Sequence, residues 1–266
     1  ISSQYNKRLC HGRRSFAVLR EQTLPLFYTI HAKESSGSKF TDVDGNEYID
    51  IAMGFGVHLF GHNPNFLIEA LNKQLKLGLQ LGPEHPDTGE VASLLNEITG
   101  CDRFTFCNTC TEAVMTAIRI VRAATKRQKI AVFKNSYHGH FDSTLVVPDL
   151  DKGNFQAKPM ALGSPPSMAE DVVVLDFAKE SALNYIRQHG HDLAAIIVEP
   201  VQNRRPDLHP REFLQQLREI TLKTKTVLLF DEILVGFRIA QGGAQEWFDV
   251  KADMVTYGKI IGGGIP

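Results

Sequence analysis

The sequence lacks several features that would mark particular classes of protein. Four cysteines among 266 residues are too few and too scattered for a disulfide scaffold, so a reducing, cytoplasmic location is expected. No apolar run approaches the stretch of about 20 residues that a membrane helix needs. The formal net charge of −1 gives no field to attract nucleic acid or an anionic membrane. We therefore expect neither nucleic acid nor a membrane as a partner.

What is present is an ordinary globular composition, with 43% hydrophobic and 22% charged residues, which argues against disorder. The length suits one large domain or two smaller ones. Residues 1–36 begin with an Arg-rich, acid-poor stretch. Its weak amphipathic periodicity favours an N-terminal segment or linker over an organellar transit peptide. The other end stops at GGGIP, within a Gly-rich motif, so we expect a partial sequence.

The pattern of apolar residues divides the rest of the chain at residue 64. Residues 37–63 predict a hairpin that turns at Asp44-Gly45, followed by a Gly-rich loop. Helices are expected at 64–77, 87–99, 111–125, 178–189 and 210–223, and strands at 103–107, 129–133, 172–176, 193–198, 226–230 and 254–257. This alternation predicts that residues 64–266 form an α/β large domain, with a mostly parallel sheet flanked by helices.

Three local signals add detail to this outline. Asn63 is expected to cap the first helix of the large domain, with Pro64 in its first turn. Asp87 and Glu90 form a capping-box pattern for the second helix. The prolines and glycine between Gln156 and Pro166 predict a mobile loop.

Two residues near the end of the chain indicate chemistry. Asp231 follows the apolar run VLLF, and an acid at the end of a buried strand lies at the carboxyl edge of a sheet, where open α/β folds bind ligands. Lys259 precedes IIGGG, an uncharged setting that suits an amine forming a Schiff base. Together they indicate a pyridoxal 5'-phosphate site, with Lys259 bonded to the cofactor and Asp231 facing the pyridinium nitrogen.

The turn CNTCTEA, residues 107–113, joins a predicted strand to a predicted helix. The free backbone N–H groups and the dipole at the helix start, with the hydroxyls of Thr109 and Thr111, favour an anion such as a phosphate. The alternative is that these threonines simply cap the helix. Cys107 and Cys110 form a single CxxC pair with no second pair and no histidine at ligand spacing, so we expect no metal there.

Further candidates follow two other predicted strands. Tyr137 and His138 lie in SYHGHFD, where an aromatic ring can stack on a planar cofactor. His138 and His140 lack the convincing third ligand that a metal site would need. Glu199 and Gln202 follow the apolar strand AAIIV. Glu199 fits either a functional acid or an ordinary ion-pair partner at a strand end.

The chain resembles the class III, fold-type I pyridoxal-phosphate aminotransferases, and most closely the branch containing glutamate-1-semialdehyde aminomutase. The resemblance is carried by NTCTEAVMTAIRIVRAATKRQKIAVFKNSYHGHFD, by FDEILVGFR with GGAQEWF, and by ADMVTYGKIIGGG. It extends from about Gly37 to Pro266. A narrower likeness, to aminotransferase domains of the hybrid polyketide–non-ribosomal peptide synthetases of secondary metabolite biosynthesis, rests on MGFGVHLFGHN, LQLGPE and VEPVQNRRPDLHP.

The resemblance implies a role for each candidate residue. Lys259 would bind the cofactor as a Schiff base and move a proton to and from the substrate carbon. Asp231 would keep the ring nitrogen protonated. The other cofactor contacts would be Thr109, Cys110 and Thr111 at the phosphate, Tyr137 stacked on the ring with His138 beside it, Glu199 close by, and Gln202 at the hydroxyl oxygen of the ring.

Two departures from the family pattern matter. The family usually has glycine where this chain has Cys110. If the backbone there is left-handed, a side chain costs about 1–2 kcal/mol. It also crowds the phosphate, so Cys110→Gly is expected to strengthen cofactor binding. The second departure is length: the C-terminal small domain, and a threonine through which the partner subunit of the family's homodimer contacts the phosphate, are missing.

The sequence leaves three functions open. The first is an aminotransferase that moves an amino group from a small-molecule amino-acid donor to a keto or aldehyde acceptor, which the synthetase likeness indicates is a β-ketoacyl chain on a carrier protein. Arg204 and Arg205 would then bind the donor's carboxylate or the carrier's phosphopantetheine arm, although most arginine pairs are solvated. The second is the glutamate-1-semialdehyde 2,1-aminomutase of tetrapyrrole biosynthesis. The third is an inert domain that binds the cofactor without reacting.

Overall fold

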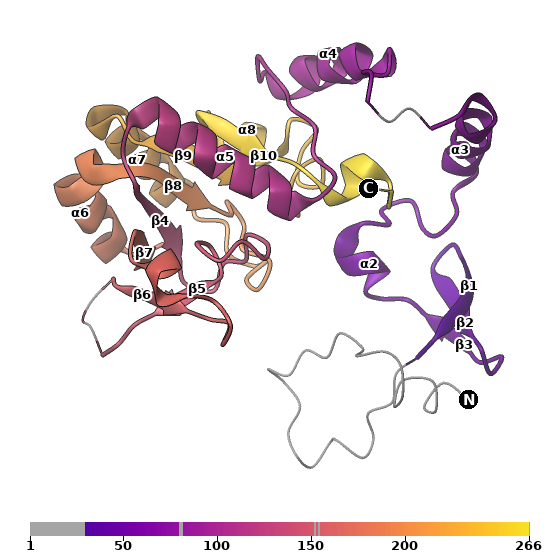
Figure 1. Cartoon of the computed structure of the whole chain (residues 1–266), viewed down its shortest axis with the longest axis horizontal. Coiled ribbons are helices and arrows are strands. Elements are labelled where there is room, and N and C mark those ends of the chain that lie inside the picture. Colours follow the sequence, from indigo (N-terminus) through magenta and orange to yellow (C-terminus); the bar gives the residue numbers. More distant parts are fainter. Residues whose placement is uncertain (1–29, 80–81, 152, 154, 266) are drawn as a thin grey trace. The chain divides into compact units, whose positions relative to one another are not determined.

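The computed structural model describes residues 30–79, 82–151, 153 and 155–265, and the chain divides into two compact units between Leu81 and Gly82. In the first unit, an antiparallel sheet has the order β1-β2-β3, with β1 at Ala32–Ser36, β2 at Lys39–Asp42 and β3 at Glu47–Ile49 (Figure 1). The predicted hairpin is confirmed. Strand β1 was not expected because its sequence, AKESS, contains no large apolar residue. The predicted boundaries at 36/37 and 63/64 stay predictions, and most of the segment 1–36 lies outside the described residues.

The described part of the first unit also contains two helices, α2 at Met53–Gly56 and α3 at Asn65–Leu77. The start of α3 differs from the expected one. Asn63 has a φ of 53° and its side-chain amide donates to the carbonyl oxygen of Ser35 at 2.6 Å, while Pro64 is the N-cap. Asn63 is therefore not the cap, because its side chain is bonded to β1.

The second unit is built on a five-stranded sheet in the order β10-β9-β8-β4-β7. Its strands are β4 at Lys129–Phe133, β7 at Val172–Leu175, β8 at Leu193–Val198, β9 at Val227–Asp231 and β10 at Met254–Thr256. All neighbouring pairs in this sheet are parallel. The predicted parallel α/β sheet is confirmed, and each of these strands lies close to its predicted bounds.

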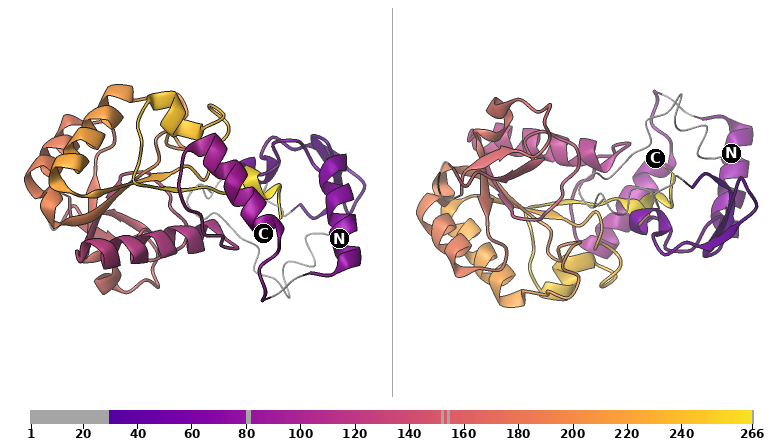
Figure 2. Two further views of the ribbon diagram at one scale, coloured as in Figure 1. Left: turned by 90° about the horizontal axis from the view of Figure 1, so that it is seen from above. Right: turned by 90° about the horizontal axis from the view of Figure 1, so that it is seen from below.

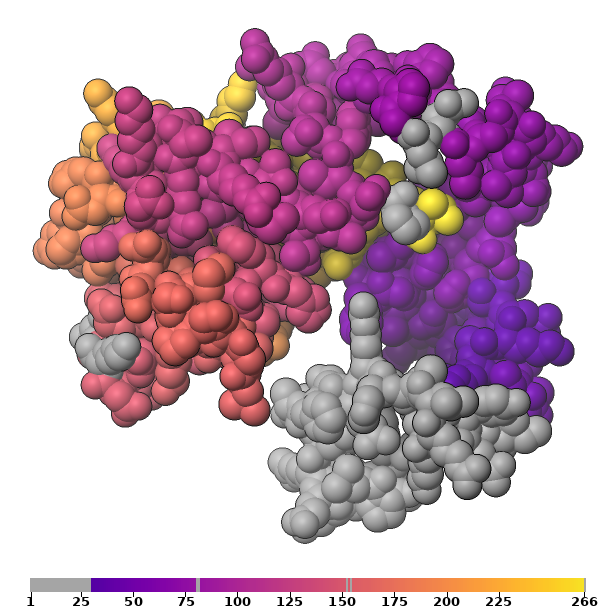
Figure 3. Space-filling model, in the orientation of Figure 1, coloured from indigo at the N-terminus to yellow at the C-terminus, as the bar shows by residue number. Residues whose placement is uncertain are grey.

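Helices cover both faces of this sheet, as the sequence predicts. They are α5 at Cys110–Thr125, α6 at Glu180–His189, α7 at Arg211–Thr224 and α8 at Gly243–Phe248. A further helix, α4 at Asp87–Thr99, contacts α8. Helix α5 packs on one face, with its outer side at the surface, and α6 and α7 pack on the other (Figures 2 and 3). Every residue of β8 is buried. Strands covered on both faces consist of continuous apolar runs, which is why the sequence located them well.

The ends of α4 test two predictions. The capping box expected at Asp87 and Glu90 is wrong: Pro86 is the N-cap, and the N–H of Asp87 donates to Nδ1 of His85 at 3.3 Å. The two acids instead lie within the first turn, where the helix dipole favours negative charge. Gly100, which directly follows the expected helix 87–99, is its left-handed C-cap with a φ of 68°.

Two further expectations are wrong. Residues 103–107 form no strand, and no described strand pairs with them, so their β-rich composition has no ladder to join. The loop expected between Gln156 and Pro166 includes a strand, β6 at Ala157–Pro159, which pairs antiparallel with β5 at Val146–Pro148. The prolines misled because a strand of a small sheet tolerates proline where no N–H is needed for pairing.

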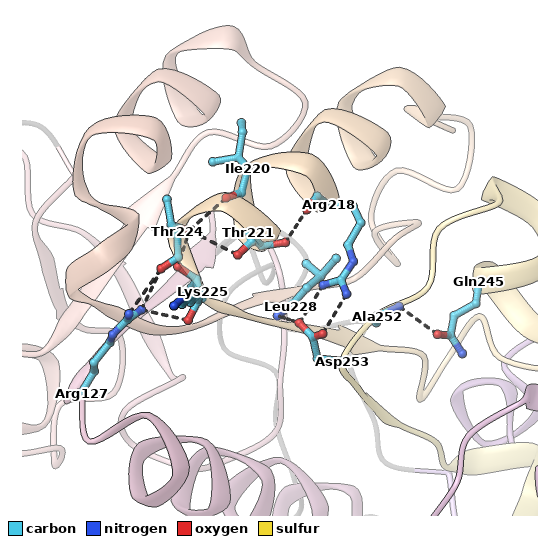
Figure 4. Close-up of polar contacts among 11 residues, drawn as sticks. Arg127, Arg218, Ile220, Thr221, Thr224, Lys225, Leu228, Gln245, Ala252 and Asp253 are labelled. Atoms are coloured by element: carbon cyan, nitrogen blue, oxygen red, sulfur yellow. Dashed lines mark hydrogen bonds and ion pairs between the residues drawn. The ribbon is translucent and has the colours of Figure 1, made fainter.

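At the amino edge of the five-stranded sheet, Arg127 joins several segments (Figure 4). Arg127 follows α5 in the chain, and its guanidinium group reaches the end of α7, the start of β8 and the short turn η3 at Gly190–Asp192. Nη1 donates at 3.0 to 3.4 Å to the carbonyl oxygens of Gly190, Leu193, Thr224 and Lys225. Nη2 also donates to the carbonyl oxygen of Thr224, at 3.3 Å. One side chain thus links the helical layers on the two faces of the sheet.

Candidate active site

The predicted site residues share one place in the second unit, the carboxyl ends of the parallel strands, where open α/β folds bind ligands. Tyr137 and His138 follow β4, Glu199 and Gln202 follow β8, Asp231 ends β9, and Lys259 follows β10. The start of α5 reaches the same edge, because the backbone N–H of His140 donates to the Thr111 hydroxyl oxygen at 3.1 Å.

A buried pair forms the centre of this edge. Asp231 Oδ2 lies 2.6 Å from Nδ1 of His138, and the two side chains are 3% and 1% exposed. The other oxygen of Asp231 accepts the N–H of Ile233 at 3.1 Å and the hydroxyl of Thr256 at 3.4 Å. Three donors fix this carboxylate, and its roughly four acceptor positions leave room for one more N–H donor.

The pair favours the charged form of His138. Burial alone would lower the pKa of His138, but the hydrogen bond to Asp231 and the negative charges of Asp231 and Glu199 raise that pKa above its ordinary value of 6.5. The second ring nitrogen, Nε2, is buried and has no hydrogen-bond partner among the described residues. Because an unpaired buried donor costs about 1–3 kcal/mol, this atom supports a polar group bound beside the pair.

Glu199 is a second buried acid at this edge, with 5% of its surface exposed. It accepts the backbone N–H of Tyr137 at 3.2 Å and the side-chain amide of Asn203 at 2.9 Å. Burial raises the pKa of Glu199, although the charge of His138 acts in the opposite direction. Both hydrogen-bond donors to Glu199 are uncharged amide groups. These contacts are therefore not the ordinary ion pair that a strand-end acid forms.

Gln202 holds the turn that follows β4. Its amide nitrogen donates to the carbonyl oxygen of Lys134 at 3.0 Å and to the hydroxyl of Ser136 at 2.9 Å. The Gln202 side chain therefore positions the segment that carries Tyr137. Ser136 and Asn203 belong to this cluster and were missed, because a polar residue in a loop gives no signal until the fold provides its partner.

At the start of α5, Thr109 forms the capping box that the sequence left as an alternative. Its hydroxyl accepts the N–H of Glu112 at 3.1 Å, and the Glu112 carboxylate accepts the N–H of Thr109 at 2.8 Å. Thr111 differs, since its oxygen accepts from His140 and its hydroxyl hydrogen can still donate. The donors left for an anion are the N–H groups of Cys110 and Thr111, in the first helical turn, and the Thr111 hydroxyl.

Cys110 requires a correction. It is the first residue of α5 and does not have a positive φ, so the backbone strain expected from a left-handed conformation is absent. Crowding of the phosphate by this side chain stays a prediction; the structure places the Cys110 sulfur 2.5 Å from where a Cβ on Gly258 would lie. The thiol is therefore packed against the residue that precedes Lys259.

Lys259 begins a short 3-10 turn, η4 at Lys259–Gly262, with a φ of 52°. A positive φ outside glycine costs about 1–3 kcal/mol and is concentrated at functional sites. In the parallel register of β9 and β10, Thr256 pairs with Asp231. Lys259 therefore leaves the sheet from the strand beside Asp231 and at the same edge.

The remaining candidates lie at the surface. Tyr137 is 42% exposed and packs edge-to-face against His140, with ring centroids 5.9 Å apart, so part of its ring is accessible to a ligand. Arg205 forms a two-pronged ion pair with Asp207 at 2.8 and 3.0 Å, and Arg204 is exposed. No described contact joins these arginines to the Asp231–His138 pair.

Glu232 was missed by the sequence analysis. It is 1% exposed, next to Asp231, and its carboxylate accepts N–H groups at the start of α8. Burial raises the pKa of Glu232 to about 7. The signal that could have found it is FDE, in which a second acid directly follows a buried strand.

The described part of the chain contains neither a metal site nor a membrane-spanning helix. No set of three histidine, cysteine, aspartate or glutamate side chains is arranged to hold a metal ion. No helix has the length and apolar character needed to cross a membrane.

A parallel sheet with an acid at the end of one strand, a lysine after its neighbour and a helix N-terminus beside them matches the fold-type I pyridoxal-phosphate transferases. More narrowly, the chain belongs to the class III aminotransferases, because residues 20–266 match the family described as Aminotransferase class-III.

Individual relatives fit this assignment. The chain is 40% identical over 242 residues to the glutamate-1-semialdehyde 2,1-aminomutase of Methanosphaera stadtmanae, which covers 90% of this chain and 56% of that protein. The structure of this chain is similar to that of an omega-transaminase from Sphaerobacter thermophilus, with a TM-score of 0.88 and 33% sequence identity. The match covers 99% of this chain and 61% of the transaminase chain. The structure of a transaminase with PLP bound matches with a TM-score of 0.86 and 30% sequence identity. This match covers 100% of this chain and 61% of the transaminase chain. The chain thus spans little more than half the length of the curated relative.

Proposed function

We propose that this chain is the cofactor-binding part of a pyridoxal 5'-phosphate enzyme that moves an amino group. The observation that carries the proposal is that Asp231 ends one strand and Lys259 follows the neighbouring strand at the same sheet edge, with Asp231 bonded to the buried His138. Membership of the class III aminotransferases supports the same conclusion.

The described residues fit this cofactor. The unpaired Nε2 of His138 and the open donors at the start of α5 suit a ligand that carries a phosphate. When bound, pyridoxal 5'-phosphate supplies an electron sink for the substrate. Asp231 accepts the ring N–H and keeps the proton at that nitrogen, while His138 fixes Asp231. Lys259 holds the cofactor through its amine and moves the proton at the substrate carbon.

The other site residues act in binding and positioning. Tyr137 stacks on the ring, and Glu199 and Gln202 hold the turns around it through the contacts described above. Thr109 contributes by capping α5. The phosphate is bound by Thr111 and by the backbone N–H of Cys110. These five side-chain roles are proposals that titrating alanine variants with pyridoxal 5'-phosphate can test.

Cys110→Gly is expected to raise the affinity for pyridoxal 5'-phosphate by a few-fold at most, because the change relieves crowding near the phosphate but no backbone strain. Fluorescence titration of both proteins measures the difference. Cys107→Gly, at an exposed cysteine before the helix, is the matched control. Equal or weaker affinity in Cys110→Gly would contradict the crowding argument.

For the reaction, we favour the aminomutase chemistry, in which the amino group returns to the same molecule, because the 40%-identical relative carries that name. Intermolecular transamination is the second candidate, supported by the similarity to the omega-transaminase. Incubation with glutamate-1-semialdehyde and no amino donor separates them. Formation of the tetrapyrrole precursor supports the aminomutase, whereas a strict need for a separate donor supports the transaminase.

The partners are also proposals. A homodimer is expected from the family resemblance. A carrier-bound β-ketoacyl substrate gains no support from the relatives described above. If it is the acceptor, loss of Arg204 and Arg205 should raise the Michaelis constant for the carrier or for the amino donor. An unchanged constant for both would remove these arginines from the site.

Lys259→Ala is expected to abolish covalent cofactor attachment. Wild-type protein mixed with pyridoxal 5'-phosphate and reduced with borohydride should carry a pyridoxyl group on the peptide containing Lys259, detected by mass spectrometry. Lys251→Ala, which removes an exposed lysine, should keep that group. Cofactor binding with no label in the wild type would support the inert domain, and no binding at all would overturn the proposed function.

A further inference from the structure

Glu232 has a buried carboxylate that bonds backbone N–H groups rather than a cation. Oε2 accepts the N–H of Ala244 at 2.6 Å, and Oε1 accepts that of Gln245 at 3.3 Å. Both donors lie in the first turn of α8. Because burying an acid is costly unless it is well bonded, these two contacts fix where α8 begins relative to the end of β9.

Two glycines make this close approach possible. A Cβ on Gly243 would lie 2.2 Å from Oε2 of Glu232, and Gly243 has a φ of 77°, so the position suits only glycine. A Cβ on Gly236 would lie 2.6 Å from the carbonyl oxygen of Glu232 and 3.0 Å from the ring of Tyr257. The backbone around Glu232 is therefore packed tightly on both α8 and Tyr257.

The same contacts lead to Lys259. The side-chain amide of Gln245 donates to the hydroxyl of Tyr257 at 3.4 Å. The backbone N–H of Glu232 donates to the carbonyl of Thr256 at 2.9 Å. Thr256, Tyr257 and Gly258 immediately precede Lys259, so the segment that presents the lysine is held from two directions.

We propose that Glu232 is a positioning residue for Lys259: it fixes the start of α8, which holds Gln245 against Tyr257 and so sets the turn that presents the lysine. This inference rests on the proposed function, since it concerns a lysine that bonds to the cofactor. It separates two parts of the site. Glu232 supports the bond to Lys259, whereas Asp231, His138 and the start of α5 bind the ring and phosphate without it.

Pyridoxamine 5'-phosphate distinguishes these two parts, because its amine cannot form the bond to Lys259. In Glu232→Ala, the dissociation constant for pyridoxal 5'-phosphate is expected to rise about tenfold, the scale of one lost buried hydrogen bond. The constant for pyridoxamine 5'-phosphate should stay near the wild-type value. Glu232→Gln keeps an acceptor oxygen and should restore most of the loss. Glu219→Ala, at an exposed acid of α7, is the matched control.

Gly243→Ala gives a second variant that leaves Glu232 in place but pushes its carboxylate off α8. It should show the same difference between the two ligands, whereas Gly89→Ala, whose added Cβ meets nothing within 4 Å, should not. Equal weakening of both ligands, or no change in either, overturns the inference alone. If the wild-type protein binds neither ligand, the proposed function fails and the inference fails with it.

Discussion

Arg127→Met is expected to lower the free energy of unfolding of the second unit by about 3 kcal/mol, because charged hydrogen bonds contribute about 1.5–3 kcal/mol each and are not additive. The variant keeps an apolar stem but loses every donor to the carbonyls of Gly190, Leu193 and Thr224. For a unit of this size, the melting temperature should fall by about 10 °C. Urea unfolding followed by circular dichroism measures the change.

Arg187→Met is the matched control for this prediction. Arg187 also has polar partners, Glu180, Asn184 and Gln216, but its side chain is 41% exposed, and exposed pairs contribute about 0–1 kcal/mol. Equal losses in the two variants would show that Arg127 is no more important than a surface arginine. Such a result would contradict its role in joining the layers of the fold.

The sheet was predictable because its signal is local. Every residue of the runs KIAVF and LAAIIV is buried except Lys129, so composition alone marks them as strands of a covered parallel sheet. The carboxyl edge then follows from the strand order, which brings Asp231 and Lys259 to one place. Residues 103–107 have a similar composition but form no strand, since strand formation depends on a partner that a local pattern cannot provide.

The polar network was predictable only in part. Asp231 and His138 were each expected near the cofactor, but their 2.6 Å contact joins positions 93 residues apart, and no local pattern encodes such a distance. Cys110 shows a different limit. The sequence identified an unusual residue, but the reason given depended on a backbone angle that only the structure supplies. Glu232 was passed over because its partners are backbone groups of α8, which have no side-chain signature.

The folded protein is expected to lose stability as the pH rises from about 4.5 to about 7, because of Glu232. Its carboxyl group has an ordinary pKa of 4.5 in the unfolded chain and a pKa of about 7 when buried. Between these values the folded state holds a proton that the unfolded chain has released, so the free energy of unfolding falls with rising pH. A shift of this size corresponds to about 3 kcal/mol over the window.

Two other buried groups act in the same direction. Burial also raises the pKa of Glu199, so its contribution to stability is lost as the pH rises through the folded value. His138 has a raised pKa, so its stabilising contribution is fully present below 6.5 and is lost as the pH rises through its own folded value. The wild-type slope therefore contains contributions from groups other than Glu232, and only a variant isolates Glu232.

Glu232→Gln isolates it because glutamine cannot ionise but keeps an acceptor for the Ala244 N–H. Urea unfolding at both ends of the window should show a smaller loss than in the wild type, with the variant the more stable protein near neutral pH. Glu219→Gln, at an exposed position of α7, should keep the wild-type slope. If Glu232→Gln also keeps that slope, Glu232 is ionised throughout the window. The two N–H donors on α8 would then stabilise the charged carboxylate by more than burial destabilises it, and the pKa of Glu232 would not be raised.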